Sequence, residues 1–429
     1  MRTRSAFRPT STLTAILATV PPLVACGEGS PPERVGATVE RDTIGDTVVV
    51  RTVSGSAWGE PARLVAEVAI GELDGPFEYL FGQPVSLGAG ADGTIYVVDR
   101  QGPELRAYAP DGTYRATLAG AGEGPGELKG PDGGLAVLSD GRILVRDPGN
   151  ARIQVFGPDG EPVETWPLRG GFNTSSPMLR DVRDNVYVHI LVDPQADIRN
   201  WVIGRVRIGP DGVAGDTLVP PDVDYEAPAL EARREGSVSR TGVPFSAGED
   251  VAMHPGGYFV HGVATEYAVT LHRPGAPLRI ERIYEPIPVT TGERREEELR
   301  VTRNMRQNQE GWRWNGPAIP DHKPPFRDLY TGRDGRIWVH VSMPGVQRDD
   351  PDYDPTDPDA VPDEWTEPVA WDVFEEDGTY LGRVDAPEGF RTYPTPVFDG
   401  DLVWATAEDE LGVIRVVRYR VERGMGTED

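Results

Sequence analysis

Short hydrophobic runs, each entered through a tight turn, recur six times along this chain. In every copy an Asp-Gly pair or a close variant precedes two to four β-branched or aromatic residues. The copies lie at Asp92–Val97, Asp140–Val145, Asp184–Val188, Gly256–Val260, Asp334–Val339 and Asp399–Trp404. Asp-Gly and Gly-Gly accept the positive φ of tight hairpins, and the residues that follow favour strands, so each copy predicts a turn leading into a strand.

A second turn signal follows the strand in most copies, as Pro-Asp-Gly or Glu-Asp-Gly. These turns stand at 110–112, 158–160, 210–212 and 376–378. Between the two turns, segments such as Arg152–Phe156 alternate hydrophobic and polar residues, which indicates strands with one buried face. One repeat is therefore predicted to be a four-stranded antiparallel meander.

Six such meanders bury both faces when they are arranged radially, which is the logic of a β-propeller. After the last Asp-Gly copy only Val413–Val421 remains as a further strand, one short of a complete unit. The strand-like Arg63–Ile70 near the start can supply it. The sequence thus predicts an all-β, six-bladed propeller of four-stranded antiparallel blades, with the last blade closed by an N-terminal strand.

Two segments resemble a known family. Ala119–Leu128 resembles the G-x-G-E-G-P-G-E-[FL] link between the first two blades of bacterial six-bladed, NHL-repeat-like propeller lipoproteins, and Arg336–Val339 is a second match. The resemblance covers roughly residues 60 to 422 and implies the same fold. The glycine-rich segment has no helix pattern after it, so it is interpreted as a blade-to-blade crossover and not as a phosphate loop.

The N-terminus predicts export. Three arginines precede an apolar stretch that is too short and broken to span a membrane, and Leu23–Cys26 resembles the lipobox of bacterial lipoproteins. Residues 1–25 are predicted to be a signal peptide, Cys26 to carry the lipid, and residues 26–61 to form a tether with a strand at 47–53. We expect a membrane-anchored lipoprotein at the periplasmic face or the cell surface.

The charge excludes one class of partner. The chain carries −26, and removal of residues 1–25, which hold three arginines and no acidic residue, would leave −29. Such a surface repels phosphate backbones, so nucleic-acid binding is not expected. The expected membrane partner is the lipid on Cys26, and a monomer is expected.

The predicted propeller comprises residues 62–423, and longer spacing between the turn copies places insertions in its middle. The turn copies stand 48 and 44 residues apart at first and then 72 and 78. The segment 219–248 is expected to be a surface loop, 290–325 a helical insertion between blades four and five, and 347–365 an acidic loop. Residues 424–429 form a short tail. Loops on a rigid scaffold often carry binding function.

The helical insertion contains the first candidate site. Thr290 and Glu293 form a capping-box pattern that begins a charged helix. Beyond it, Trp312, Arg313 and Trp314 place two rings around a cation. They can form a lid that contacts a ligand, or the tryptophans can anchor the insertion to the blade beneath.

The acidic loop is rich in carboxylates from Asp349 to Asp359, which suggests calcium. It lacks the glycine and the closing glutamate of an EF-hand loop, and its prolines oppose convergence on one ion. A mobile acidic loop is the preferred interpretation.

Aligning the second strands of the repeats reveals a polar column. It holds Val98, Arg146, His189, His261, His340 and Ala405. Three histidines suggest zinc, but neighbouring copies in a propeller stand about 10 Å apart, too far for shared ligation at about 2 Å. A polar belt between blades is predicted, with an anion-binding or pH-sensing ring as the alternative.

The predicted function is a non-catalytic binding module for a protein, peptide or glycan at the insertion-bearing face. No cofactor is expected. Related propellers include lactonases, lyases and strictosidine-synthase-like enzymes, so a metal-dependent hydrolase or lyase is the alternative, and a structural role in envelope assembly is another. No nucleophile elbow or H-E-x-x-H is present, and a fold alone does not define an activity.

Overall fold

The computed structural model describes residues 36–168, 174–196, 201–351, 353, 354, 356, 357 and 360–424. These residues belong to one compact unit. The predicted signal peptide, Cys26, the first part of the tether and most of the C-terminal tail lie outside the described residues. No helix in the described ranges has the length and apolar character needed to cross a membrane.

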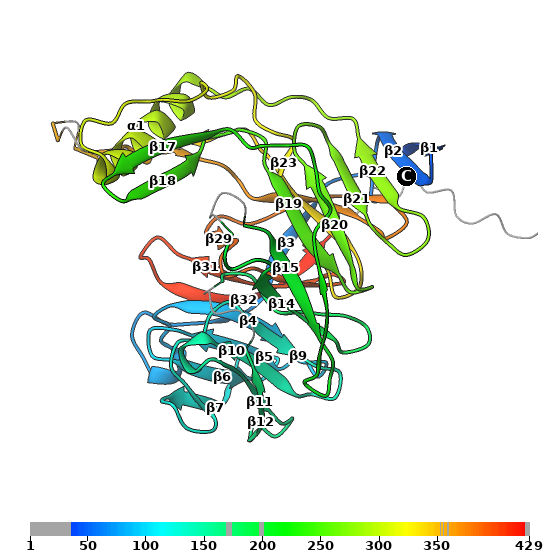
Figure 1. Ribbon diagram of the computed structural model, residues 1–429, viewed down its shortest axis with the longest axis vertical. Helices are drawn as coiled ribbons and strands as arrows, with labels where there is room; N and C mark the ends of the chain where they lie inside the picture. Colours follow the sequence, from blue (N-terminus) through cyan, green and yellow to red (C-terminus); the bar gives the residue numbers. More distant parts are fainter. Residues whose placement is uncertain are drawn as a thin grey trace, which may run out of the picture. The chain divides into compact units, whose positions relative to one another are not determined.

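The strands of the described part of the chain, many of which are labelled in Figure 1, can be grouped into six successive antiparallel units of four strands, which we name repeats 1 to 6. Repeat 4 belongs to a six-stranded sheet, and repeats 5 and 6 share a nine-stranded sheet. Repeat 1 consists of β4(Pro84–Ala89), β5(Ile95–Asp99), β6(Glu104–Tyr108) and β7(Tyr114–Ala121). Repeat 2 consists of β9(Leu135–Val137), β10(Ile143–Asp147), β11(Arg152–Phe156) and β12(Pro162–Pro167). Repeat 3 consists of β13(Leu179–Arg180), β14(Val186–Leu191), β15(Ile203–Ile208) and β16(Ala214–Leu218). Repeat 4 consists of β19(Glu249–His254), β20(Tyr258–Val263), β21(Ala268–Leu271) and β22(Leu278–Arg282). Repeat 5 consists of β23(Phe326–Thr331), β24(Ile337–Val341), β27(Ala370–Phe374) and β28(Tyr380–Asp385). Repeat 6 consists of β30(Val397–Asp399), β31(Leu402–Glu408), β32(Ile414–Glu422) and β3(Ala62–Ile70). The chain is therefore almost entirely β.

The last repeat is composite, with one strand from the N-terminal part of the chain. The strand expected at 63–70 is present as β3 and pairs antiparallel with β32, from Arg63↔Glu422 to Ile70↔Val416. β3 also pairs parallel with β28 of repeat 5. The short β29(Phe390–Arg391) pairs with β31, and β8(Glu127–Leu128) pairs with β7.

An N-terminal hairpin extends repeat 4. The strand expected at 47–53 is present as β2(Thr47–Ser54), which pairs parallel with β22, and β1(Thr38–Ile44) pairs with β2. In β2 the side chains of Val49, Val50 and Thr52 are buried, whereas β1 is exposed throughout. Part of the predicted tether is thus built into the folded body.

Hydrophobic clusters join each repeat to the next in sequence. Val85 packs with Leu135 between repeats 1 and 2, and similar clusters link 2 to 3, 3 to 4, 4 to 5 and 5 to 6. A further cluster joins Trp404 and Val416 of repeat 6 to Leu87 of repeat 1. Because successive strand residues point to opposite faces, each sheet can pack on two neighbours at once.

The entry turns have the predicted geometry. Gly93, Gly141 and Gly335 have φ between 82 and 90°, where glycine avoids the steric penalty of a Cβ. In repeat 3 the left-handed position is taken by Asp184, at φ 61°. Its carboxylate accepts hydrogen bonds from the Ser139 backbone N–H and from Arg180, at 2.9 Å each, and these bonds help to hold the turn.

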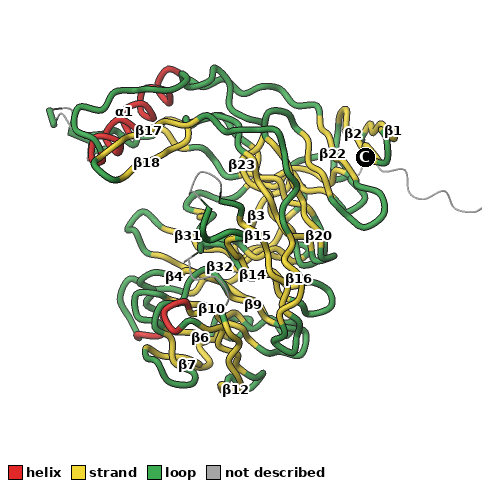
Figure 2. The backbone as a smooth tube through the Cα atoms, viewed as in Figure 1, coloured by secondary structure: helices red, strands yellow, loops and turns green. Residues whose placement is uncertain are grey.

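The insertions form a small subdomain with a core of its own. The helix α1(Thr291–Asn308) begins at the predicted Thr290–Glu293 capping box and lies beside a hairpin of β17(Ala229–Arg234) and β18(Ser237–Gly242) (Figure 2). The expectation of a surface loop at 219–248 was wrong for this hairpin. Leu230 and Ala232 alternate with polar residues and are buried against the helix, a short pattern that the surrounding charged residues obscured.

Two short strands mark the ends of the acidic loop. β25(Val346–Gln347) pairs with β26(Trp365–Thr366), and residues 352, 355, 358 and 359 lie outside the described residues. One-turn 3₁₀ helices occur at Phe77–Tyr79 and Pro148–Asn150.

Candidate functional site

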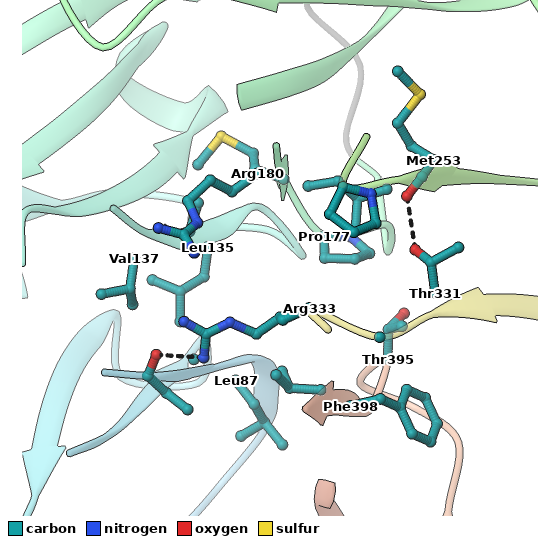
Figure 3. Close-up of a pocket in the computed structure, with 18 of the residues that line it drawn as sticks. Leu87, Leu135, Val137, Pro177, Arg180, Met253, Thr331, Arg333, Thr395 and Phe398 are labelled. Atoms are coloured by element: carbon teal, nitrogen blue, oxygen red, sulfur yellow. Dashed lines mark hydrogen bonds between the residues drawn. The ribbon is translucent and has the colours of Figure 1, made fainter. Parts of the chain in front are cut away.

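A cavity of about 120 Å³ is lined by the first strand, or the residues beside it, of every repeat. Repeat 1 provides Leu87–Ala89, repeat 2 Leu135–Val137, repeat 3 Pro177–Val182, repeat 4 Met253 and Pro255, repeat 5 Thr331–Arg333, and repeat 6 Thr395–Phe398. We call it the first-strand cavity (Figure 3). Its position beside the Asp-Gly turns results from the repeated strand–turn–strand unit, because each first strand ends where its turn begins.

Most of the cavity wall is apolar. Leu87, Leu135, Val137, Met253 and Phe398 present hydrocarbon, thioether or aromatic surface. The polar Thr331 is occupied, since its Oγ1 donates a hydrogen bond to the Met253 carbonyl at 2.7 Å. Such walls favour a ligand with an apolar body.

Two arginines, Arg180 and Arg333, are the cationic members of the described lining (Figure 3). Arg180 lies at the end of β13, and its Nη1 lies 2.9 Å from Asp184 Oδ1. Arg333 precedes the Asp334-Gly335 turn, and its Nη1 donates to the Ala89 carbonyl at 2.9 Å. Both side chains are about one-quarter exposed, 26% and 27%, so each guanidinium still reaches the cavity.

Arg333 is partly buried and has charged neighbours of both signs. Burial lowers the pKa of Arg333, and the nearby Arg180 lowers it further, whereas Asp399, 3.7 Å from Nη1, opposes the shift. Two cations that repel each other in a partly dehydrated space favour an anion between them.

The acidic residue in the lining is already engaged. Asp181 accepts hydrogen bonds from the backbone N–H groups of Arg183 and Asn185, and from Tyr187 Oη at 3.0 Å. These bonds assign Asp181 to the turn of repeat 3. The chemistry available to a ligand is therefore a pair of guanidiniums, each with one carboxylate neighbour, in a largely apolar cavity.

The histidine column lies elsewhere, on the second strands. His189 is 7% exposed, and burial, followed by Arg205 and Arg146, lowers its pKa to about 3. Arg146 contacts Asp132 in a buried ion pair. His340 Nδ1 lies 2.7 Å from Asp328 Oδ2.

Through-space interactions connect these groups from one repeat to the next. Arg205 interacts with Asp250 of repeat 4, and Asp250 with Asp328 of repeat 5. Burial raises the pKa of Asp250 to about 6. We call this chain of charged and polar side chains the polar belt. Its members are Asp132, Arg146, His189, Arg205, Asp250, Asp328 and His340.

His261 does not belong to the second-strand column in which the sequence alignment placed it. The turn hydrogen bond from Gly257 N to His254 O matches that from Gly93 N to Gly90 O, so Gly262, not His261, is equivalent to Val98. A one-residue offset turns the side chain to the other face of the sheet. His261 instead lies 3.1 Å from Glu249 within its own repeat.

Trp312 and Trp314 make their contacts within the insertion subdomain. Trp312 is 1% exposed, and its Nε1 donates to the Glu231 carbonyl of β17 at 2.7 Å. Trp314 Nε1 donates to the Pro317 carbonyl, and the two rings stand 6.4 Å apart. Arg313 is exposed beside them. In this structure Trp312 serves as an anchor and presents no open surface to a ligand.

Within the described ranges, no three His, Cys, Asp or Glu side chains are grouped so as to hold a metal ion. The predicted lipidation site, Cys26, lies outside those ranges.

Arg180 and Arg333 were not among the ligand-binding residues expected from sequence, although a signal was present. Four residues before the left-handed turn residue, the first three repeats hold Ala89, Val137 and Arg180. A long cation in a column of apolar residues on a first strand stands out once the first strands, and not the second strands, are aligned.

No protein-family model matches the chain, and no curated protein matches it in sequence. Among solved structures, it is similar to a member of the DUF4221 family from Bacteroides vulgatus (8% identity, TM-score 0.44, covering 85% of this chain and 99% of that one). It is also similar to a putative exported protein from Bacteroides fragilis, with 10% identity and a TM-score of 0.43 over 84% of this chain and 95% of that one. Virginiamycin B lyase from Staphylococcus aureus is similar as well, with 10% identity and a TM-score of 0.36 over 78% of this chain and 94% of that one. Similarities at this level assign no activity to the chain.

Proposed function

We propose that this chain is a lipid-anchored, extracytoplasmic six-bladed β-propeller that acts as a binding module, and that its first-strand cavity binds the carboxylate end of a peptide. The observation that carries the proposal is the pair of guanidiniums, Arg180 and Arg333, inside an apolar cavity to which every repeat contributes.

Two features support ring closure and the propeller. The hydrophobic clusters follow a cyclic order, from repeat 1 to repeat 6 and back to repeat 1. In addition, the first strands of all repeats line one cavity, as the innermost strands of a radial arrangement would. The segment Ala119–Leu128 resembles the blade link of propeller lipoproteins, which favours the same interpretation.

The chemistry of the cavity favours a peptide among the ligands expected from sequence. A C-terminal carboxylate can accept hydrogen bonds from both guanidiniums, and a neighbouring hydrophobic side chain can occupy the apolar wall. A cavity of about 120 Å³ limits the bound group to roughly one residue. A glycan would leave the apolar wall without a partner.

N-acetyl-leucine and its amide test whether the first-strand cavity binds a carboxylate. Calorimetric titration of the protein should show binding of N-acetyl-leucine at least tenfold tighter than that of N-acetyl-leucinamide, because charge-assisted hydrogen bonds contribute about 1.5–3 kcal/mol each. Arg180→Ala and Arg333→Ala should each weaken the binding of the carboxylate about tenfold or more, and lysine at either position should restore part of it.

Arg207→Ala is the matched control, since Arg207 is 42% exposed and pairs with Asp216 away from the cavity. It should leave the affinity unchanged. Equal affinities for acid and amide, or no effect of either cavity substitution, would contradict the proposal.

A second prediction tests the anchor. Cys26→Ala removes the only cysteine and with it the proposed lipid attachment. When the full chain is expressed in a bacterial host, the variant should move from the membrane fraction to the soluble fraction, as seen by immunoblotting after fractionation. Continued association of the variant with membranes would refute lipid anchoring.

A further inference from the structure

A cleft of about 400 Å³ lies between the helical insertion and the end of the acidic loop. α1 lines one wall with Glu296, Glu297 and Arg300, and β26 lines another with Trp365. Phe245, from the segment between β18 and β19, closes a third side. The cleft shares no lining residue with the first-strand cavity.

Two aromatic side chains in the cleft are held in place by their surroundings, and Phe245 also packs against the core of the insertion. Phe245 has φ +58°, a left-handed conformation that is a strained outlier for a bulky residue. The ring is covered on one side by Lys323, 5.2 Å from its centroid. Trp365 packs on the first turn of α1, where a Cβ at Gly292 would overlap the indole. Both rings are therefore fixed in place, and both line the cleft.

Ion pairs neutralise the charged residues of the cleft. Arg300 binds Glu296 at 2.6 Å and also pairs with Glu297, and Arg348 and Arg327 pair with Asp363 and Glu367. Lys323 lies 2.6 Å from Glu293 and 2.8 Å from Glu367. Five lining carboxylates, three lining arginines and Lys323, which pairs with two of the carboxylates, leave a charge of about −1, and this selects against strongly charged ligands of either sign.

Polar edges nevertheless remain accessible. Arg300 and Arg327 are 39% and 38% exposed, and the Glu297 carboxyl, whose pKa burial raises, is 24% exposed. Carboxylates can accept hydrogen bonds from hydroxyl groups, and guanidiniums can donate to them. Aromatic faces with such edges around them suit a flat ligand with many hydroxyls and no charge.

We infer that this cleft is a binding site for a neutral saccharide, with Trp365 and Phe245 as stacking surfaces and Arg300 and Glu297 as hydroxyl partners. The site is separate from the proposed peptide site, so each can fail without the other.

The test is a glycan array of neutral and acidic glycans probed with the full chain, followed by titration of the best neutral glycan. Binding to neutral glycans is expected, and Trp365→Ala and Phe245→Ala should each weaken it tenfold or more. Trp365→Phe, which keeps a ring, should lose less than about threefold. Glu297→Gln should also weaken binding while leaving the thermal unfolding temperature unchanged, which separates a binding role from a structural one.

Trp314→Ala is the matched control, because Trp314 belongs to the same insertion but does not line the cleft. It should bind the glycan as wild type does. Failure to bind any glycan, a preference for acidic glycans, or equal affinity of the wild type, Trp365→Ala and Glu297→Gln would overturn the inference. The affinity for N-acetyl-leucine should be unchanged in all of these variants.

Discussion

Replacing Asp372 with alanine should lower the free energy of unfolding by about 3 to 5 kcal/mol, as measured by urea denaturation. Asp372 of β27 is 0% exposed and accepts hydrogen bonds from Tyr267 and Tyr380 at 2.6 Å each. Arg282 of β22 lies 2.6 Å away as its ion-pair partner. Alanine would leave two buried hydroxyls and a guanidinium without their acceptor, at the contact between repeats 4 and 5.

Two variants set the scale for this effect. Tyr380→Phe removes one hydrogen bond and should cost about 1 kcal/mol. Asp216→Ala is the matched surface control, because Asp216 is 83% exposed and pairs with Arg207 at 3.3 Å, so its loss should stay below about 0.5 kcal/mol. A loss below about 1 kcal/mol for Asp372→Ala would show that the network is dispensable.

Acidification should change stability in opposite directions through two groups of the polar belt, the buried His189 and the half-buried Asp250. The pKa of His189 is about 3 in the folded protein and near 6.5 when unfolded, so the unfolded state binds more protons below pH 6.5. Its contribution to stability is therefore lost as the pH falls from about 6.5 toward 3. Relative to wild type, His189→Gln should gain about 2 kcal/mol of stability between pH 7 and pH 5.

Asp250 has the opposite sign. Its folded pKa of about 6 exceeds the unfolded value of 3.8, so the folded state binds more protons below pH 6, and stability rises as the pH falls through that value. Arg205 and the Leu329 backbone N–H favour the charged form, and Asp328 opposes it. Asp250→Asn should stabilise the protein by about 1–3 kcal/mol at pH 7.5, and this advantage should shrink toward pH 5.

Denaturation midpoints measured from pH 5 to 7.5 test both expectations. His322→Gln serves as the control, since the His322 side chain is exposed, and its pH dependence should follow wild type. Parallel profiles for wild type, His189→Gln and Asp250→Asn would contradict the account of the belt.

The repeated units were predictable because their signals are local. A turn glycine with positive φ and the alternation of one strand lie within about ten residues, so Gly93 and Gly335 could be recognised without any neighbour. The capping box at Thr290 is equally local, and its helix begins where expected. The missing strand of repeat 6 could be inferred because five complete units showed what the sixth lacked.

The hairpin β17–β18 and the register of repeat 4 were missed for a different reason. A buried alternation of only Leu230 and Ala232 is too short to be distinguished from a charged loop. In repeat 4 the turn is Gly256-Gly257 and has no aspartate, so the sequence offers no marker for register, and His261 was placed one position out of line. Register is decided by hydrogen bonds to the partner strand, which sequence does not display.

The sequence by itself determined the turn-and-strand units, their order along the chain, the complementing strand β3 and a strongly negative net charge. Only the tertiary structure decided which side chains meet. Arg180 and Arg333 are 153 residues apart and converge because the first strands of repeats 3 and 5 face one cavity. Phe245 and Trp365 converge because the insertion folds onto the acidic loop. Periodicity is a property of one segment, whereas a binding site depends on the packing of several, and this is why the candidate sites appeared only in three dimensions.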